Sequence, residues 1–234
     1  MARPTQPIKA SLPPSVRRFA AAIAVLVAVV SLGPVLIQHG SPARLAREEA
    51  PLTYLSAAIL LATSCCAAWI GLRQRGPWPW LAVGFGYLTL DELLRGHERL
   101  DWAIHHHLLR RPETPLTDHL DDLIIIGYVL IGLAILLRYR AELSRFREAR
   151  PFLVWTFVFT ATTIAFDLAN NDIVRLFAID PRAPQEWIEW LRLAEETAKV
   201  AAEGALLCAV FYCAHLAGLS AGGQPASSSE SPPQ

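Results

Sequence analysis

The sequence contains few charged residues and no excess of either sign. Charged residues make up 18% of the 234 residues, and 21 lysines and arginines balance 21 aspartates and glutamates. A nucleic-acid-binding domain needs a basic face, whereas these arginines are spread through short segments between apolar runs. The composition therefore excludes a basic nucleic-acid-binding domain, and we expect no nucleic-acid partner.

Several motifs of enzyme chemistry are also missing. The chain has no CxxC pair, no metal-finger spacing, no glycine-rich phosphate loop, no serine-centred elbow and no dinucleotide fingerprint. The spaced histidine pairs of membrane desaturases are absent, as is the late histidine pair of ceramidase-like hydrolases. All four cysteines lie in apolar runs, and we predict that they are small buried side chains: Cys65, Cys66, Cys208 and Cys213.

Apolar residues dominate the chain instead. They make up 53% of the sequence and give a mean hydropathy of +0.32, which is typical of a multi-pass membrane protein. A bilayer core of ~30 Å requires a helix of ~20 residues. Backbone groups in lipid must be satisfied within each span, which favours helices here. Six runs are long enough to span, at residues 19–37, 51–72, 78–94, 120–137, 151–168 and 190–216.

We therefore predict an all-α integral membrane protein, a bundle of about six transmembrane helices within residues 19–217. Proline-rich and serine-rich composition predicts disordered tails at residues 1–18 and 218–234. Alternatively, the first run is a cleaved signal peptide, because the small residues at 40–43 resemble a cleavage site. Cleavage would not invert the spans that follow.

The loops between the runs predict the orientation. One side carries nine arginines outside the spans, with only Glu142 and Glu148 as acids among them: Arg17, Arg18, Arg73, Arg75, Arg138, Arg140, Arg145, Arg147 and Arg150. Basic loops stay on the cytoplasmic side of a membrane. Both termini should thus be cytoplasmic, and we expect the protein in the cell membrane of a prokaryote, the inner or plasma membrane.

Residues 91–122 concentrate ionisable side chains between two apolar runs. They include five of the seven histidines, together with acids and arginines. Ionisable groups at membrane depth are costly, so their presence is by default a hypothesis about function. We therefore expect a site on the outer side of the membrane.

Chain direction brings further acids to the same level. With six spans and a cytoplasmic N-terminus, the third and fifth spans end outside while the fourth and sixth begin there. The acids that converge in this way are Asp91, Glu92, Glu98, Asp122, Asp167, Glu195 and Glu196. Glu203 lies deeper, ~20 Å along the last span from Trp190. It should face the bundle interior, with Lys199 one turn away as a partner.

Helical spacing suggests how residues 91–105 are presented. If the helix continues through Gly96, a single stripe contains Asp91, Arg95, Glu98, Trp102 and His105. The histidines at 105–107 cannot all face one point on a helix, because neighbouring residues differ by ~100° in direction. We interpret this triplet as part of a wet interfacial loop.

Three functions are compatible with these residues. In the first, a metal-assisted or acid–base enzyme acts on a lipid or a small amphipath. Carboxylates and imidazoles bind divalent zinc, iron or manganese, and the candidate ligands are His97, Glu98, Asp122, Glu195 and Glu196. Asp91, Glu92 and Glu203 are the candidate catalytic residues in that hypothesis. Arg95, Asp167 and Lys199 would support them.

The second function is a proton- or cation-coupled transporter, in which acids, histidines and Lys199 at different depths relay protons or bind a cation. The third is a structural scaffold. There, Arg95, Arg99 and Lys199 neutralise the acids in internal salt bridges, and no chemistry occurs.

The chain also resembles a set of uncharacterised prokaryotic multi-pass membrane proteins with no established activity. Their spans end in Asp-Glu, a four-residue gap and His-Glu, as at Asp91-Glu92 and His97-Glu98, and a last span opens with paired acids, as at Glu195-Glu196. The resemblance implies a shared fold and shared site residues at these six positions. This chain departs from it in having Leu93-Leu94-Arg95-Gly96 in the gap.

Overall fold

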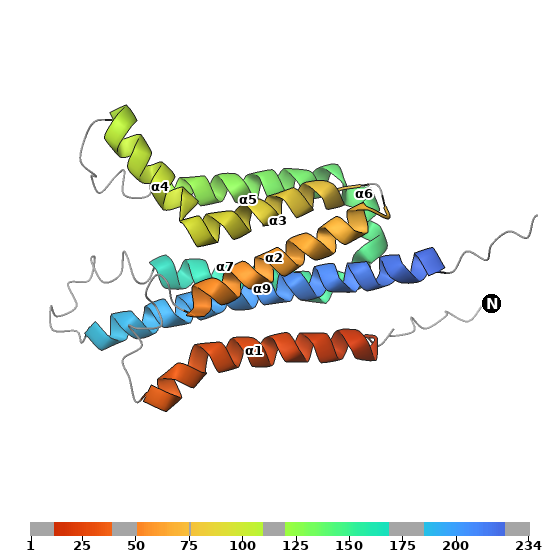
Figure 1. Ribbon diagram of the computed structural model, residues 1–234, viewed down its shortest axis with the longest axis horizontal. Helices are drawn as coiled ribbons and strands as arrows, with labels where there is room; N and C mark the ends of the chain where they lie inside the picture. The colour runs from red at the N-terminus through yellow and green to blue at the C-terminus, as the bar shows by residue number, and fades with distance from the viewer. Residues whose placement is uncertain (1–11, 39–50, 75, 110–119, 169–184, 223–234) are drawn as a thin grey trace, which may run out of the picture.

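The computed structural model describes residues 12–38, 51–74, 76–109, 120–168 and 185–222, and every regular element within these ranges is a helix (Figure 1). The long helices are α1 (Pro14–Gln38), α2 (Pro51–Gly71), α3 (Trp78–Leu94), α5 (Leu120–Arg138), α7 (Arg150–Leu168) and α9 (Gln185–Gly222). The shorter elements are α4 (Gly96–Ala103), the π-helix η2 (Ile104–Leu109), α6 (Arg140–Leu143) and the 3-10 helix η3 (Ser144–Ala149). All-α architecture is therefore confirmed for the described residues.

Within the described residues, four stretches are long and apolar enough to cross a membrane. They are Pro14–Gly33, Pro51–Gly71, Arg140–Asp167 and Glu189–Leu219. By length and composition, the chain thus has helices that could cross a membrane. The 17-residue α3 is shorter than the ~20 residues that a full span requires, and Ile126–Arg138 of α5 forms a shorter apolar helix. The count of six spans stays a prediction.

Two helices extend beyond their predicted limits. The first begins at Pro14, so residues 14–18 are helical rather than part of a tail, and the Arg17 amide donates to the Pro13 carbonyl at 3.0 Å. Proline suits the first turn of a helix because its missing N–H needs no partner there. At the other end, the 38 residues of α9 extend for about 57 Å, which exceeds the ~30 Å core of a bilayer.

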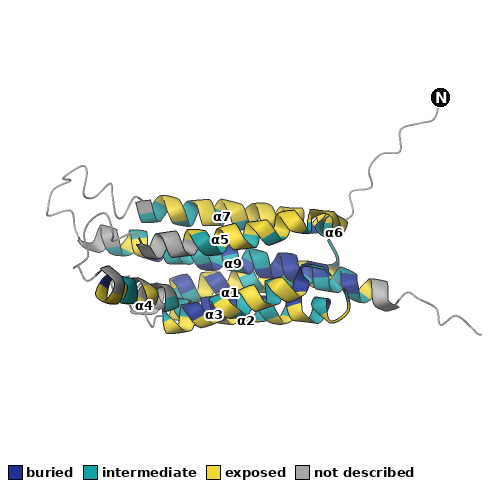
Figure 2. Cartoon of the chain, turned by 90° about the horizontal axis from the view of Figure 1, so that it is seen from above, coloured by how far each residue is buried: buried dark blue, intermediate teal, exposed yellow. Residues whose placement is uncertain are grey.

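The last helix, α9, lies at the centre of the bundle. It packs against α1, α2 and α7, and Figure 2 shows buried residues concentrated along α9 and α2. By contrast, α5 and α7 expose large apolar side chains such as Val129, Leu130 and Phe157. A lipid bilayer is the environment that suits such surfaces, because lipid tails are as apolar as these side chains.

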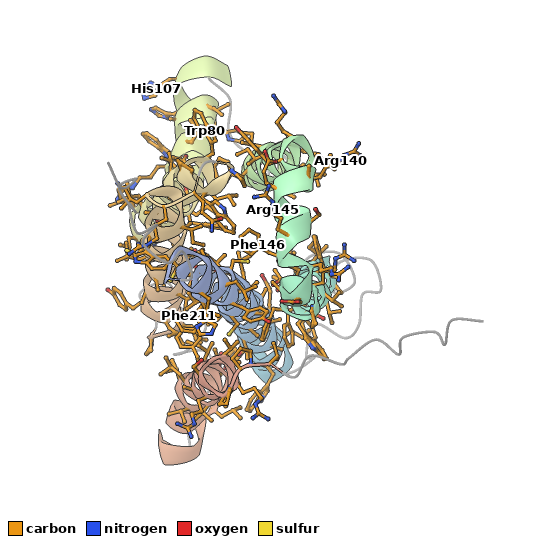
Figure 3. All side chains as sticks on the ribbon, turned by 90° about the vertical axis from the view of Figure 1, so that its right-hand side faces the viewer. Trp80, His107, Arg140, Arg145, Phe146 and Phe211 are labelled. Atoms are coloured by element: carbon orange, nitrogen blue, oxygen red, sulfur yellow. The ribbon has the colours of Figure 1, made fainter. Side chains whose placement is uncertain are left out.

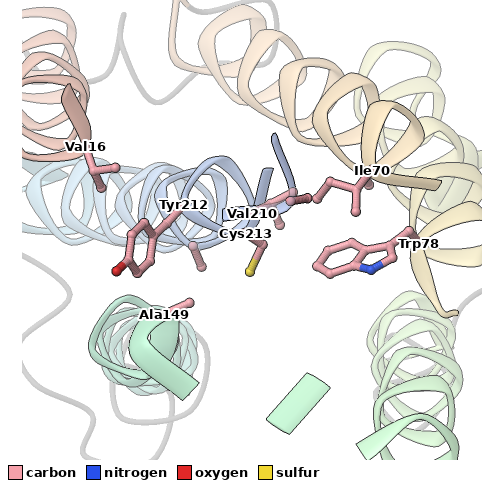
Figure 4. Close-up of a cluster of buried hydrophobic side chains, with 10 residues drawn as sticks. Val16, Ile70, Trp78, Ala149, Val210, Tyr212 and Cys213 are labelled. Atoms are coloured by element: carbon pink, nitrogen blue, oxygen red, sulfur yellow. The ribbon is translucent and has the colours of Figure 1, made fainter. Parts of the chain in front are cut away.

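Two apolar clusters hold the helices together. One lies at the end of the bundle where α1 begins, and it includes Val16, Ile70, Trp78, Ala149 and Tyr212 (Figure 4). The other includes Val27, Leu52 and Val200. The burial predicted for the cysteines is correct for Cys208 and Cys213 but wrong for Cys65, which is exposed on α2.

A glycine brings α1 close to α9. A Cβ atom at Gly204 would lie 2.9 Å from Ile23 Cγ2, a distance that ordinary side chains do not reach. Gly204 follows Glu203 directly. Because α1 approaches so closely, it covers the part of α9 that lies next to Glu203.

The chain bends sharply between α3 and α4. Arg95 adopts a left-handed conformation, with φ 52° and ψ 52°, and its amide donates to the Asp91 carbonyl. The single stripe through Asp91, Arg95 and His105 required a helix that continues through Gly96, and this condition is not met, because a left-handed residue ends the helix and redirects the chain. Figure 1 shows α4 leaving the axis of α3 at this point.

Candidate functional site

Three ionisable residues of α9 lie on one face of that helix. Glu196, Lys199 and Glu203 stand at i, i+3 and i+7, a spacing that places side chains above one another. The Lys199 ammonium lies 3.5 Å from Glu196 Oε2. Lys199 is also one turn from Glu203, so its charge acts on both acids.

Two neighbouring helices complete the arrangement. From α3, Glu92 Oε1 accepts a hydrogen bond from Lys199 Nζ at 2.9 Å. From α2, the fully buried Ser56 donates its hydroxyl to Glu203 Oε1 at 3.0 Å. We call Ser56, Glu92, Glu196, Lys199 and Glu203 the Glu–Lys cluster. It joins α2, α3 and α9 through polar contacts inside an otherwise apolar bundle.

The second carboxylate oxygen of Glu203 is buried without a hydrogen-bond partner among the described residues. Leaving a buried polar atom unsatisfied costs about 1–3 kcal/mol, and more if the group is charged. Binding a proton would remove the charge of this carboxylate. The oxygen is therefore the chemically least satisfied atom of the Glu–Lys cluster.

Charge is unbalanced within the Glu–Lys cluster. Three carboxylates, those of Glu92, Glu196 and Glu203, surround the single ammonium of Lys199. If all four groups were ionised, the cluster would carry an excess of two negative charges. A charged group at membrane depth is costly unless it is compensated, so the arrangement favours uptake of a proton or a cation.

Asp91 and Arg95 belong to the α3–α4 junction. Asp91 is 8% exposed, and its Oδ1 lies 2.5 Å from the position that a Cβ of Gly96 would occupy. The lack of a side chain at Gly96 thus makes room for the Asp91 carboxylate. The predicted catalytic residue Asp91 therefore has a structural position at the bend of the chain.

A further pair of acids lies across the contact between α7 and α9. The negative charges of Asp167 and Glu195 act on each other, and Glu196 adds to the negative potential at Glu195. The predicted convergence of acids from the fifth and sixth apolar runs thus has a counterpart in the structure. It places an acidic group next to the Glu–Lys cluster.

The predicted metal ligands are only partly described. Side chains of His97, Glu98 and Asp122 lie outside the described residues. Among the residues that are described, no three His, Cys, Asp or Glu side chains are placed to hold one metal ion. Glu195 and Glu196 alone are too few ligands for zinc, iron or manganese, so the metal site stays a prediction.

The three adjacent histidines are helical. They lie in the π-helix η2, where His105 is 4% exposed and His106 and His107 face outward. His106 stacks on Trp102 with 4.8 Å between ring centroids. The prediction of an irregular loop is wrong here, because a π-helical turn accommodates the triplet.

Sequence reasoning missed Ser56. The only signal is a hydroxyl within the apolar run that forms α2, and Thr63 and Ser64 give the same signal. Thr63 bonds to the carbonyl of its own preceding turn and Ser64 to the carbonyl of Ala82. Only the packing of α2 against α9 distinguishes Ser56 as the partner of an acid.

Four described helices are long and apolar enough to cross a membrane, and a partly buried cluster of carboxylates and one lysine lies between α2, α3 and α9; together they define the class of helical proteins with membrane-length helices and an internal polar cluster. The chain belongs to the family described as Domain of unknown function (DUF8692), whose model matches residues 18–214. The match includes every residue of the Glu–Lys cluster. No curated protein and no solved structure matches the chain.

Membership in this family agrees with the resemblance to an uncharacterised set of proteins. The Asp-Glu and His-Glu motif and the prokaryotic origin stay predictions.

Proposed function

We propose that this protein is a proton-coupled membrane transporter in which Glu203 takes up and releases the coupling proton. The observation that carries the proposal is the buried Glu203 carboxylate, which has one oxygen bonded to Ser56 and the other without a described partner. A proton needs only one carboxylate oxygen, whereas a metal ion needs several ligands in a fixed geometry. The geometry therefore favours a proton over a metal cation at Glu203.

Lys199 provides a means of coupling that proton to the contact between α3 and α9. With Glu203 neutral, the Lys199 ammonium remains on Glu92 at 2.9 Å and links α3 to α9. Once Glu203 releases its proton, the new carboxylate one turn away competes for the same ammonium. A weaker bond to Glu92 would then loosen α3 from α9, which is the kind of helix movement that transport requires.

The protonation of Glu203 can be tested directly by infrared difference spectroscopy on the purified protein. We expect a carboxylic acid band that disappears as the pH is raised and that is absent in Glu203→Gln. Glu142→Gln, the same substitution in the exposed link helix α6, should leave the band unchanged. A Glu203 carboxyl that stays ionised at every pH of a folded sample would refute the proposal.

Transport requires a second measurement. Proteoliposomes loaded with a pH-sensitive dye should acidify when a potassium diffusion potential is imposed, and Glu203→Gln should abolish this change while Glu142→Gln retains it. If the band titrates but no proton crosses, Glu203 binds a proton without conducting it across the membrane. A Glu203→Gln protein that differs from the original in stability alone would favour the scaffold.

A further inference from the structure

The link between α5 and α7 carries a dense set of exposed cations. Between residues 138 and 150 the chain places five arginines, and all of them are exposed: Arg138, Arg140, Arg145, Arg147 and Arg150. We call these five residues the arginine surface. Within the described part of the chain, none of them forms an ion pair with a carboxylate.

Apolar residues of the same link fix its orientation. The Phe146 ring meets the Trp78 ring edge-on with 5.3 Å between centroids, and Ala149 is 2% exposed in the apolar cluster at this end. Figure 3 shows Phe146 directed toward the bundle and Arg140 directed away from it. The link is therefore held by its apolar side, and its arginines stay outside.

The acids of the link do not neutralise this surface. The Glu148 carboxylate accepts a hydrogen bond from the Tyr212 hydroxyl of α9 at 3.3 Å, which directs it toward the bundle. Glu142 on α6 is the other acid of the link. Five cations against two acids, one of them held by Tyr212, leave a net positive surface.

The location of the arginine surface identifies what it would meet. It lies where α5 ends and α7 begins, at the same end of the bundle as the start of α1 and the end of α2 (Figure 1). That end also carries Arg17, Arg18 and Arg73, and the Arg73 guanidinium lies 3.7 Å above the Trp69 ring. Ends of membrane helices lie at the level of lipid headgroups, where basic clusters attract anionic lipid.

We propose that the arginine surface binds the phosphates of anionic phospholipid headgroups. A guanidinium group donates two parallel hydrogen bonds to a phosphate, which gives geometric specificity in addition to charge attraction. The exposed guanidinium groups of the link form no ion pairs with described carboxylates, so their donors are available to a headgroup. Anchoring through Phe146 and Ala149 means that binding needs no reordering of the link.

Thermal unfolding of the delipidated full-length protein in detergent tests the proposal. Phosphatidylglycerol should raise the unfolding midpoint more than phosphatidylcholine with the same acyl chains. Arg145→Gln with Arg147→Gln should lose most of this difference, and Arg145→Lys with Arg147→Lys should lose only part, because lysine keeps the charge without the planar fork. The matched control, Arg99→Gln with Arg192→Gln at the opposite end, should retain it.

Native mass spectrometry provides a readout that is independent of stability. The folded original protein should retain more phosphatidylglycerol than the variant with glutamines at 145 and 147. Equal midpoint shifts with the two lipids, or an equal loss in the opposite-end control, would overturn the proposal. Inorganic phosphate that reproduced the shift would also overturn it, because the surface would then bind a free anion rather than a lipid.

Discussion

Lys199 is the residue on which the polar contacts of the interior depend. The chain has only two lysines, Lys9 and Lys199, against nineteen arginines. The ammonium of Lys199 is a compact point charge with three donors, and it contacts Glu92 on α3 and Glu196 on its own helix. An arginine would present a larger planar group to the same carboxylates.

Removing this ammonium should destabilise the protein. We expect Lys199→Met to lower the free energy of unfolding by about 1–3 kcal/mol, because it leaves the part-buried Glu92 carboxylate without its ammonium partner. Unfolding of the purified protein by heat or by SDS would measure the loss. Lys199→Met combined with Glu92→Gln should recover part of it, since the substitution neutralises the orphaned carboxylate.

The exposed Arg99→Met variant provides the control and should be close to neutral. If the double variant were no more stable than Lys199→Met, the contact between Lys199 and Glu92 would not stabilise the fold.

At the level of single residues, the sequence predicted the α9 part of the cluster. Regular helical spacing is enough to align Glu196, Lys199 and Glu203. It could not predict that Lys199 bonds to Glu92, because that contact joins residues 107 positions apart. For Ser56 the sequence offers only a hydroxyl in an apolar run.

Among the elements, the α3–α4 junction is the one that departs most from the predicted pattern. The lengths of the apolar runs correctly place helices at the predicted positions, since lipid and core both require apolar side chains. They contain no information on where a helix bends. Here the left-handed Arg95 and the missing side chain of Gly96 allow the bend, and the Asp91 carboxylate occupies the resulting space.

A methyl group at Gly96 should therefore disturb this junction. We expect Gly96→Ala to destabilise the protein by about 1–3 kcal/mol, because the new Cβ overlaps the buried Asp91 carboxylate. Thermal unfolding would measure the effect. The control is Gly84→Ala on α3, where nothing lies within 4 Å of the new Cβ. It should be neutral or slightly stabilising, because alanine favours a helix over glycine by about 1 kcal/mol.

A second variant separates this clash from other effects. Asp91→Ala with Gly96→Ala removes the carboxylate that the new methyl group would meet. In the Asp91→Ala protein, Gly96→Ala should therefore lower the free energy of unfolding less than it does in the original protein. An equal cost of Gly96→Ala in both backgrounds would contradict the assignment of Asp91 to the junction.

For the whole molecule, the distribution of arginines predicts the orientation. The arginine surface and the start of α1 lie at one end of the bundle, where Trp78 at the start of α3 contacts Phe146 of the link, while Glu92 of the Glu–Lys cluster lies near the other end of α3. In membrane proteins, segments rich in lysine and arginine lie on the cytoplasmic side. We therefore expect the link η3 inside the cell and the helix α4 outside.

Cysteine labelling in intact cells would measure this orientation. The four native cysteines are first replaced by alanine, and one exposed position is then changed to cysteine. Ser144→Cys on η3 should react with a membrane-impermeant maleimide only after permeabilisation, whereas His106→Cys on η2 should react in intact cells. The reverse pattern would place the arginine surface outside and contradict the predicted topology.

The sequence by itself determined the helical class, the positions of the apolar helices and the alignment of Glu196, Lys199 and Glu203. The class and the positions follow from the lengths of the apolar runs, and the alignment follows from the period of a helix. Only the tertiary structure decided which helix supplies the partners of Lys199 and Glu203, and that Asp91 lies at a bend. The reason is that helix packing and a single left-handed residue set contacts between distant parts of the chain, and local periodicity does not encode them.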